Sequence, residues 1–208
     1  MRRGLLVDFG GVLTTDVFDS FRSFSVAEGL EPDAVKRLFR EDPRAVAELR
    51  KLETGETEEA EFASTFGAML GIQRTEGLVQ RLFAGVEPDR AMIDAVRRAR
   101  RAGVRTGLVS NSWGAGGYDR DAFPELFDGV VISGEVGLHK PQPGIFRLAA
   151  ERVGVAPARC VFVDDLRENC EGAEAVGMTS VLHRGAMGTV PELERLLGVE
   201  LRSPGSGP

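Results

Sequence analysis

The 208-residue sequence is poor in the residues that build most zinc and redox centres. It contains two cysteines, Cys160 and Cys170, and two histidines, His139 and His183. Neither cysteine has a CxxC neighbour or a pair of histidines nearby, which argues against a zinc site and against redox chemistry. We expect both thiols to be buried as small hydrophobic groups in a reducing cytoplasm, and both histidines to lie at the surface.

Long apolar runs and an excess of positive charge are also missing. No apolar stretch approaches the ~20 residues needed to cross a bilayer. We expect no signal peptide, because an apolar run that predicts a strand begins almost at once. The formal net charge is −6, with 26 Lys and Arg against 32 Asp and Glu. We therefore expect neither a nucleic-acid partner nor a membrane partner. The one basic run, residues 97–103, is interpreted as the solvated last turn of a helix.

Short apolar runs alternate with helical patterns over most of the chain. The runs that predict buried parallel strands are residues 4–10, 104–111, 129–133, 159–165 and 179–183. Intervening segments, such as 88–103 and 143–154, have proline near the start and glycine at the end, as helices often do. The alternation predicts an α/β fold with a doubly wound, Rossmann-like parallel sheet.

Residues 16–87 differ from the rest because they contain no convincing strand. Apolar residues recur there at helical spacing, as at Val35, Leu38 and Phe39, and Asp42 followed by proline is typical of a helix start. About four short helices are expected, with the phenylalanines mostly in their core. Trp113 could either line a pocket or pack under these helices, and the sequence leaves both readings open.

These patterns predict a division of the chain into a core and a cap. Residues 1–15 and 88–202 would form a discontinuous α/β catalytic core, and residues 203–208 a disordered tail. Residues 16–87 would form an inserted all-helical cap, called the helical insert below. An insert directly after the first strand would lie above the carboxyl ends of the sheet, where ligands bind in open α/β folds.

Polar residues stand at the carboxyl ends of the predicted core strands. They are Asp8, Ser110 with Asn111, Lys140, and Asp164 with Asp165. Because parallel strand ends converge on one crevice, we expect these side chains to share one pocket. Three carboxylates in a small volume repel one another unless cations lie between them. Lys140 can offset one charge, and oxygen ligands without histidine suit Mg²⁺ bound together with waters and a substrate phosphate.

In order, spacing and strand context, these residues resemble the haloacid dehalogenase superfamily of hydrolases over essentially the whole chain. The segments DFGGVLT, SGEVGLHKPQPGIF and VFVDDLRENCEGA are similar to the branch that includes the N-terminal phosphatase domain of soluble epoxide hydrolase. The resemblance implies a cytoplasmic, Mg²⁺-dependent phosphatase that acts on a small phosphorylated molecule. It leaves the substrate and the oligomeric state open.

The resemblance also implies catalytic roles. Asp8 would be the nucleophile that forms an aspartyl phosphate, which water then hydrolyses. Ser110 and Asn111 would hold the phosphate oxygens that are not transferred. Lys140 would neutralise the nucleophile and the charge that develops on the phosphoryl group.

The metal ligands follow from the same resemblance. Asp8, Asp165 and the backbone carbonyl of Gly10 would bind Mg²⁺ directly. Asp164 would act directly, through water, or by orienting Lys140. A glycine can still supply a carbonyl, so the metal site does not depend on a side chain at position 10.

Gly10 is the departure from the phosphatase pattern, which has a second carboxylate two residues after the nucleophile. That carboxylate protonates the leaving group and later activates water, and losing such help typically slows a reaction ~10²–10⁴-fold. The leaving group could need no proton, as with an anomeric sugar phosphate or an acyl phosphate. Alternatively, the substrate or a bound water could supply the proton, or another residue such as Thr15 or Asp16 could stand in.

Two other functions remain open. The chain could bind phosphate and Mg²⁺ with negligible turnover, or it could be a metal-independent 2-haloacid dehalogenase. The dehalogenase pattern has small polar residues at the positions of Asp164 and Asp165 and an aspartate at the position of Asn169. The two carboxylates present in this sequence therefore favour metal and phosphate chemistry.

Overall fold

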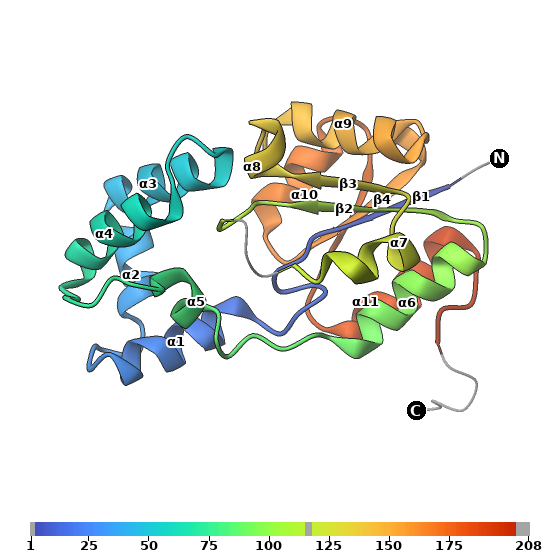
Figure 1. The fold of residues 1–208 in the computed structure, drawn as a ribbon. Coiled ribbons are helices and arrows are strands. Elements are labelled where there is room, and N and C mark those ends of the chain that lie inside the picture. The colour runs from blue at the N-terminus through green and yellow to red at the C-terminus, as the bar shows by residue number, and fades with distance from the viewer. Residues whose placement is uncertain (1–2, 115–117, 203–208) are drawn as a thin grey trace.

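A parallel β-sheet forms the centre of the molecule (Figure 1). The computed structural model describes residues 3–114 and 118–202, so the expected tail at 203–208 lies outside the described residues. Within them the sheet has five strands in the order β3-β2-β1-β4-β5, all paired in parallel. The strands are β1 (Gly4–Val7), β2 (Arg105–Ser110), β3 (Gly129–Ile132), β4 (Cys160–Asp164) and β5 (Thr179–Leu182). The predicted doubly wound α/β fold is confirmed.

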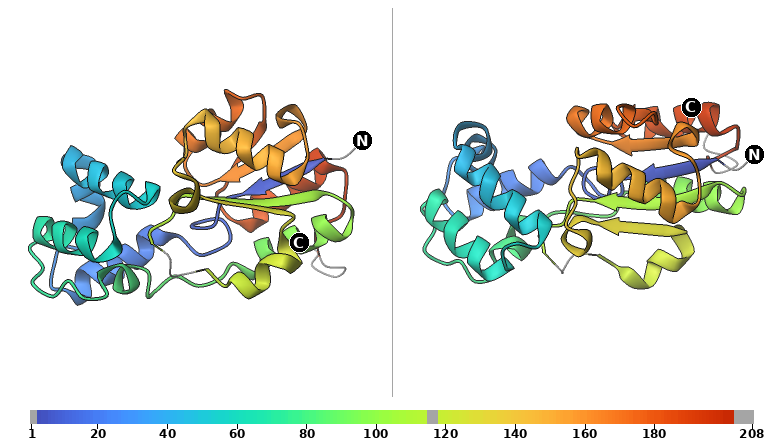
Figure 2. Two further views of the ribbon diagram at one scale, coloured as in Figure 1. Left: turned by 45° about the horizontal axis from the view of Figure 1, so that its top comes forward. Right: turned by 90° about the horizontal axis from the view of Figure 1, so that it is seen from above.

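Helices cover both faces of the sheet (Figures 1 and 2). One face carries α6 (Arg90–Arg101), α7 (Phe123–Leu126) and α11 (Ala186–Leu197), and the other carries α8 (Ser133–Val136), α9 (Pro143–Val153) and α10 (Arg167–Glu174). The described part of the core also contains two 3₁₀ turns, η1 (Arg120–Ala122) and η2 (Pro157–Arg159). Leu5 and Val7 pack on the α6 side and Leu6 on the α9 side, because successive strand residues point to opposite faces.

The helical insert consists of five helices and contains no strand within residues 16–87. They are α1 (Val17–Ala27), α2 (Ala34–Glu41), α3 (Pro43–Thr54), α4 (Glu59–Leu70) and α5 (Leu78–Leu82). The expectation of about four helices was one too few. The expected helix start is present, because the Asp42 side chain accepts the Arg44 N–H and Pro43 opens α3. The insert has its own hydrophobic core, which includes Phe21, Phe24, Phe62, Phe66, Leu78 and Leu82.

Two chain segments connect the helical insert to the core and run side by side. Thr15 donates its N–H to the carbonyl of Glu87 at 2.8 Å, and Glu87 donates to the Thr15 hydroxyl at 3.0 Å. Thr14 and Pro88 form an antiparallel bridge next to them. These hydrogen bonds hold the two connecting segments together close to the expected boundaries. The division into domains itself stays a prediction.

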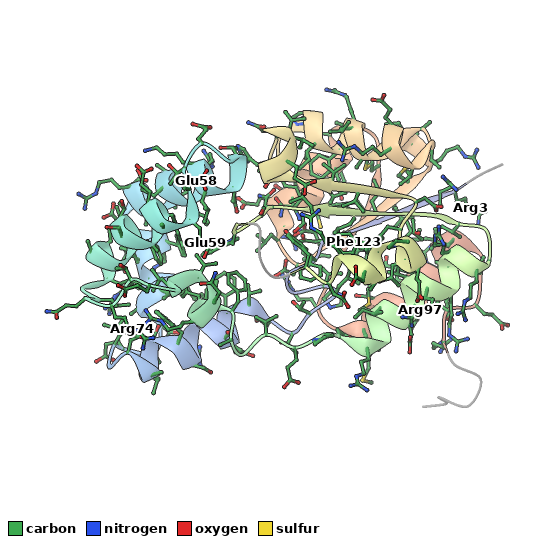
Figure 3. All side chains as sticks on the ribbon, in the orientation of Figure 1. Arg3, Glu58, Glu59, Arg74, Arg97 and Phe123 are labelled. Carbon is green, nitrogen blue, oxygen red and sulfur yellow. The ribbon has the colours of Figure 1, made fainter. Side chains whose placement is uncertain are left out.

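The basic run forms the end of α6, as expected. Arg98, Arg100 and Arg101 lie in its last turn, where cations suit the helix dipole. Arg97 pairs with Asp94 at 2.5 Å and lies on the part of the core away from the helical insert (Figure 3). Among the described residues, no helix is both long enough and apolar enough to span a membrane.

The cysteines and histidines are all buried. Both thiols are free and buried, as expected, but the expectation that the histidines lie at the surface is wrong. His139 is 8% exposed and its Nδ1 lies 2.8 Å from the carbonyl of Lys140. His183 is 6% exposed and its Nδ1 lies 2.9 Å from the Thr189 hydroxyl. Because Nδ1 of each histidine has a hydrogen-bond partner, this nitrogen is not left unsatisfied when the imidazole is buried.

Trp113 connects the α/β core to the helical insert. It follows β2 in the chain, yet its ring packs against the phenylalanines in the hydrophobic interior of the insert. The ring centroids of Phe21, Phe39, Phe62 and Phe83 lie 5.4, 5.8, 5.9 and 5.3 Å from it. Of the two readings left open by the sequence, packing under the helices is the one observed.

We predict that Trp113→Ala lowers the free energy of unfolding by about 3 kcal/mol, the lower end of the range for a large aromatic side chain, because Trp113 is only partly buried. Trp113→Phe, which keeps an aromatic ring, should lose much less. Urea unfolding followed by circular dichroism measures both. An alanine variant with the midpoint of the wild type would show that this contact does not stabilise the structure.

Candidate active site

The centre of the candidate active site is the ammonium group of Lys140, which lies between two carboxylates. Its Nζ is 2.7 Å from Oδ1 of Asp8 and 2.7 Å from Oδ2 of Asp164, and the lysine side chain is 1% exposed. Burial by itself would lower the pKa of Lys140, but Asp164 and Asp8 outweigh it and raise that pKa above its usual value. Lys140 is therefore charged at neutral pH and offsets one negative charge.

Asp8 lies at the carboxyl end of β1, where the backbone fixes it. Its N–H donates to the carbonyl of Val163 in β4 at 2.9 Å, and its Oδ1 accepts the N–H of Phe9 at 2.7 Å. Burial raises the pKa of the Asp8 carboxyl, Lys140 opposes this, and Asp164 adds to the rise. A carboxylate held in this position needs a positive charge beside it to remain ionised.

Asp164 is fully buried at the end of β4 and its oxygens are well occupied. Asn169 donates to both of them at 3.0 and 3.1 Å, and the N–H of Leu166 donates to Oδ1 at 2.9 Å. These contacts hold the Asp164 carboxylate in place. Because it also accepts a bond from Lys140, it can orient the lysine side chain.

Asp8, Asp164 and Asp165 could together hold a metal ion. One oxygen from each can be chosen so that all three lie within 4.8 Å of one another. Burial raises the pKa of Asp165 to about 6, and Asp164 contributes to the rise. Lys140 compensates only one of the three charges, so a divalent cation that prefers oxygen ligands fits this donor set.

The turn after β1 depends on Gly11 to approach this cluster. Gly11 has φ of +72°, and a Cβ atom there would lie 2.6 Å from Oδ2 of Asp165. Its N–H donates to the Thr14 hydroxyl at 3.0 Å, which closes the turn. A side chain at this position would therefore be strained and would displace Asp165.

Ser110 and Asn111 end β2 beside Lys140. The Ser110 hydroxyl is 3.0 Å from the hydroxyl of Tyr118. Asn111 accepts the N–H of Lys140 at 2.8 Å, and its Nδ2 donates to the carbonyl of Lys140 at 3.2 Å and to Glu53 at 3.3 Å. The amide of Asn111 thus positions the lysine backbone, and the expected phosphate contact would require it to release one of these partners.

Glu53 is a site residue that the sequence analysis missed. It comes from α3 of the helical insert and lies partly buried against Asn111. Burial raises the pKa of Glu53 to about 7, and Lys140 opposes this. The surrounding sequence, ELRKLETGETEE, is rich in glutamate, so no spacing or composition signal distinguishes this residue from its exposed neighbours.

The residues around Gly10 explain part of the departure from the phosphatase pattern. A Cβ atom at position 10 would lie 3.3 Å from Cγ1 of Val17, the first residue of α1. Gly10 is not among the described glycines with positive φ, so its backbone permits other residues. Asp16 caps α1 by accepting the N–H of Phe18 at 2.8 Å, and the Thr15 hydroxyl accepts the N–H of Glu87, so both have structural roles.

We predict that Asp165→Asn stabilises the protein in EDTA by about 1 kcal/mol, because it removes one of three mutually repelling carboxylates that are only partly screened by water. Adding Mg²⁺ should raise the melting temperature of the wild type but not that of this variant, since ligand binding stabilises only a state that binds it. Asp121→Asn, an exposed carboxylate outside the cluster, is the control. An equal response of all three proteins to Mg²⁺ would place the metal elsewhere.

Comparison with known proteins identifies the family. Residues 3–177 match the sequence model of the haloacid dehalogenase-like hydrolases. A glyceraldehyde 3-phosphate phosphatase from Methanopyrus kandleri is 35% identical over 108 residues, which are 50% of this chain and 46% of that protein. Bifunctional epoxide hydrolase 2 from Rattus norvegicus is 29% identical over 119 residues, 54% of this chain. The match spans only 22% of that relative's length.

A solved structure shares the fold. An enzyme of the haloacid dehalogenase family from Bacteroides thetaiotaomicron, in complex with magnesium and inorganic phosphate, superposes with a TM-score of 0.65 at 23% identity. The superposition covers 87% of this chain and 93% of that one. Since the family match extends from β1 through α10 and includes every residue of the site, the chain belongs to the haloacid dehalogenase-like hydrolases.

Proposed function

We propose that this hydrolase is a Mg²⁺-dependent phosphatase that cleaves a small phosphate ester through an aspartyl phosphate on Asp8. The observation that carries the proposal is the buried Asp8–Lys140–Asp164 arrangement with Asp165 beside it. Relatives that carry phosphatase names support the choice of phosphoryl over other substrates. The free, buried thiols suit a reducing compartment, and we propose that the enzyme acts in the cytoplasm.

In this mechanism Asp8 attacks the phosphorus atom and the bond from phosphorus to the leaving oxygen breaks. Lys140, held by Asp164 and by the Asn111 amide, counters the charge on the nucleophile and on the phosphoryl oxygens. The Ser110 hydroxyl is positioned to hold an oxygen that is not transferred. Water then attacks the phosphorus of the aspartyl phosphate and frees both Asp8 and phosphate.

Mg²⁺ would be held by Asp8, Asp165 and the carbonyl of Gly10, with Asp164 acting directly or through Lys140. When bound, it would neutralise the carboxylates and polarise the phosphoryl group as a Lewis acid. The magnesium and phosphate complex of the Bacteroides enzyme supports this assignment, because that enzyme shares the fold.

The missing carboxylate at position 10 limits the substrates unless another group supplies the proton. An acyl phosphate or an anomeric sugar phosphate has a leaving group that needs little protonation, and such substrates would be compatible with Gly10. A simple alkyl ester requires a proton donor, because an alkoxide is a poor leaving group.

We predict that Asp8→Asn reduces phosphate release at least about 10³-fold, because it removes the nucleophile. EDTA should also abolish turnover of the wild type, and added Mg²⁺ should restore it. The assay is phosphate release from acyl, anomeric and alkyl phosphates, with the surface variant Asp33→Asn as the control. Phosphate release that survives Asp8→Asn would contradict the proposal, and metal-independent halide release from 2-haloacids would replace it with dehalogenation.

A further inference from the structure

The helical insert places the carboxyl group of Glu53 next to Asn111 of the core, and the backbone around Glu53 is fixed in this position. The carbonyl of Glu53 accepts a bond from the Ser133 hydroxyl, which in turn accepts the N–H of Ser112 at 2.8 Å. Gly55, with φ of +75°, lies so close to α8 that a Cβ would be 2.9 Å from the carbonyl of Gly134. The end of α3 is thus fixed against the ends of β2 and β3 (Figure 1).

The Glu53 side chain is linked to Lys140 through Asn111, and through Lys140 to Asp8. Its Oε2 lies 3.3 Å from Nδ2 of Asn111, whose amide also bonds the backbone of Lys140 on both sides. Lys140 bonds Asp8 at 2.7 Å. In an in-line displacement, the leaving group departs on the side opposite the nucleophile. Asp8 directly follows β1, and the helical insert lies beyond the carboxyl end of that strand (Figure 1), so the leaving group would face the insert.

The environment of Glu53 suits a group that exchanges a proton. No ion pair to it is present among residues 3–114 and 118–202. Burial raises its pKa to about 7, while Lys140 and Arg50 oppose the rise. At neutral pH both protonation states are therefore populated, which favours general acid and general base catalysis by the same group.

We propose that Glu53 supplies the acid–base function that Gly10 lacks. This inference rests on the proposed phosphatase function. As the bond between phosphorus and the leaving oxygen breaks, protonated Glu53 gives its proton to that oxygen and becomes a carboxylate. The carboxylate then takes a proton from the water that attacks the aspartyl phosphate, which regenerates Asp8 and protonated Glu53. The substrate class widens accordingly to esters of ordinary alcohols.

The test separates the two chemical steps by single-turnover kinetics on an alkyl phosphate and an acyl phosphate. Glu53→Gln should slow release of the alcohol ~10²–10⁴-fold, because the leaving group then lacks a proton donor. Formation of the aspartyl phosphate from the acyl phosphate should keep its wild-type rate. The phosphorylated enzyme should then accumulate, because water attack lacks its base; mass spectrometry of the quenched protein measures it.

Two further variants make the result specific. Glu56→Gln removes an exposed carboxylate three residues away and should match the wild type in both assays. Gly10→Asp combined with Val17→Ala, which makes room at the 3.3 Å contact, should restore alcohol release in the Glu53→Gln background. The same Gly10→Asp and Val17→Ala pair with Glu53 intact is the reference. If Glu53 is the acid–base group, Glu53→Gln should cost this reference little, whereas a structural or positioning role predicts the same loss as in the wild type.

Three outcomes would overturn the inference. One is an equal loss of rate with both substrates, which would make Glu53 a positioning residue. Another is unchanged alcohol release in Glu53→Gln, and the third is failure of the Gly10→Asp rescue in a protein whose melting temperature matches the wild type. If the wild type itself forms no aspartyl phosphate from either substrate, the proposed function fails as well.

Discussion

The ion pairs of Lys140 are the constraint on which the site depends. A buried ammonium is stable only beside compensating carboxylates, and removing one partner leaves an uncompensated charge. The sheet order supplies both partners, because β1 is the central strand, with β4 on one side and β2 on the other. Asp8 and Asp164 therefore end neighbouring strands, and Asn111 at the end of β2 holds the lysine backbone. The chain also reverses its direction of strand addition at β1, the point where ligands bind in open α/β sheets.

The helical insert is fixed to this site from two directions. Trp113 reaches from the core into the aromatic cluster of the insert, and the end of α3 reaches back to Ser133 and Asn111. The same contacts place the carboxyl group of Glu53 beside Asn111, which bonds the backbone of Lys140. The proposed proton transfer thus depends on an element that the sequence separates from Asp8 by more than one helix.

The sequence predicted the features that depend on local patterns. The parallel strands follow from short apolar runs, and the polar residues at their ends follow from the way parallel strands align. It did not predict the position of Glu53, because that depends on how α3 docks against α8, a contact between distant segments. The burial of His139 was missed for a related reason, since its partner is a backbone carbonyl, which leaves no trace in the sequence. The hydrogen bonds between the Asn111 side-chain amide and the backbone of Lys140 were missed as well, because they join segments that are distant in the sequence.

The proposed mechanism requires that Asp8 becomes phosphorylated during turnover. The most direct measurement is to quench the wild-type enzyme during turnover of a phosphate ester, reduce the acyl phosphate with borohydride, and map the modified residue by peptide mass spectrometry. We expect homoserine at position 8, the product of reducing a phosphorylated aspartate, and none at Asp164 or Asp165. Phosphate release without modification of Asp8, or modification of another carboxylate, would contradict it.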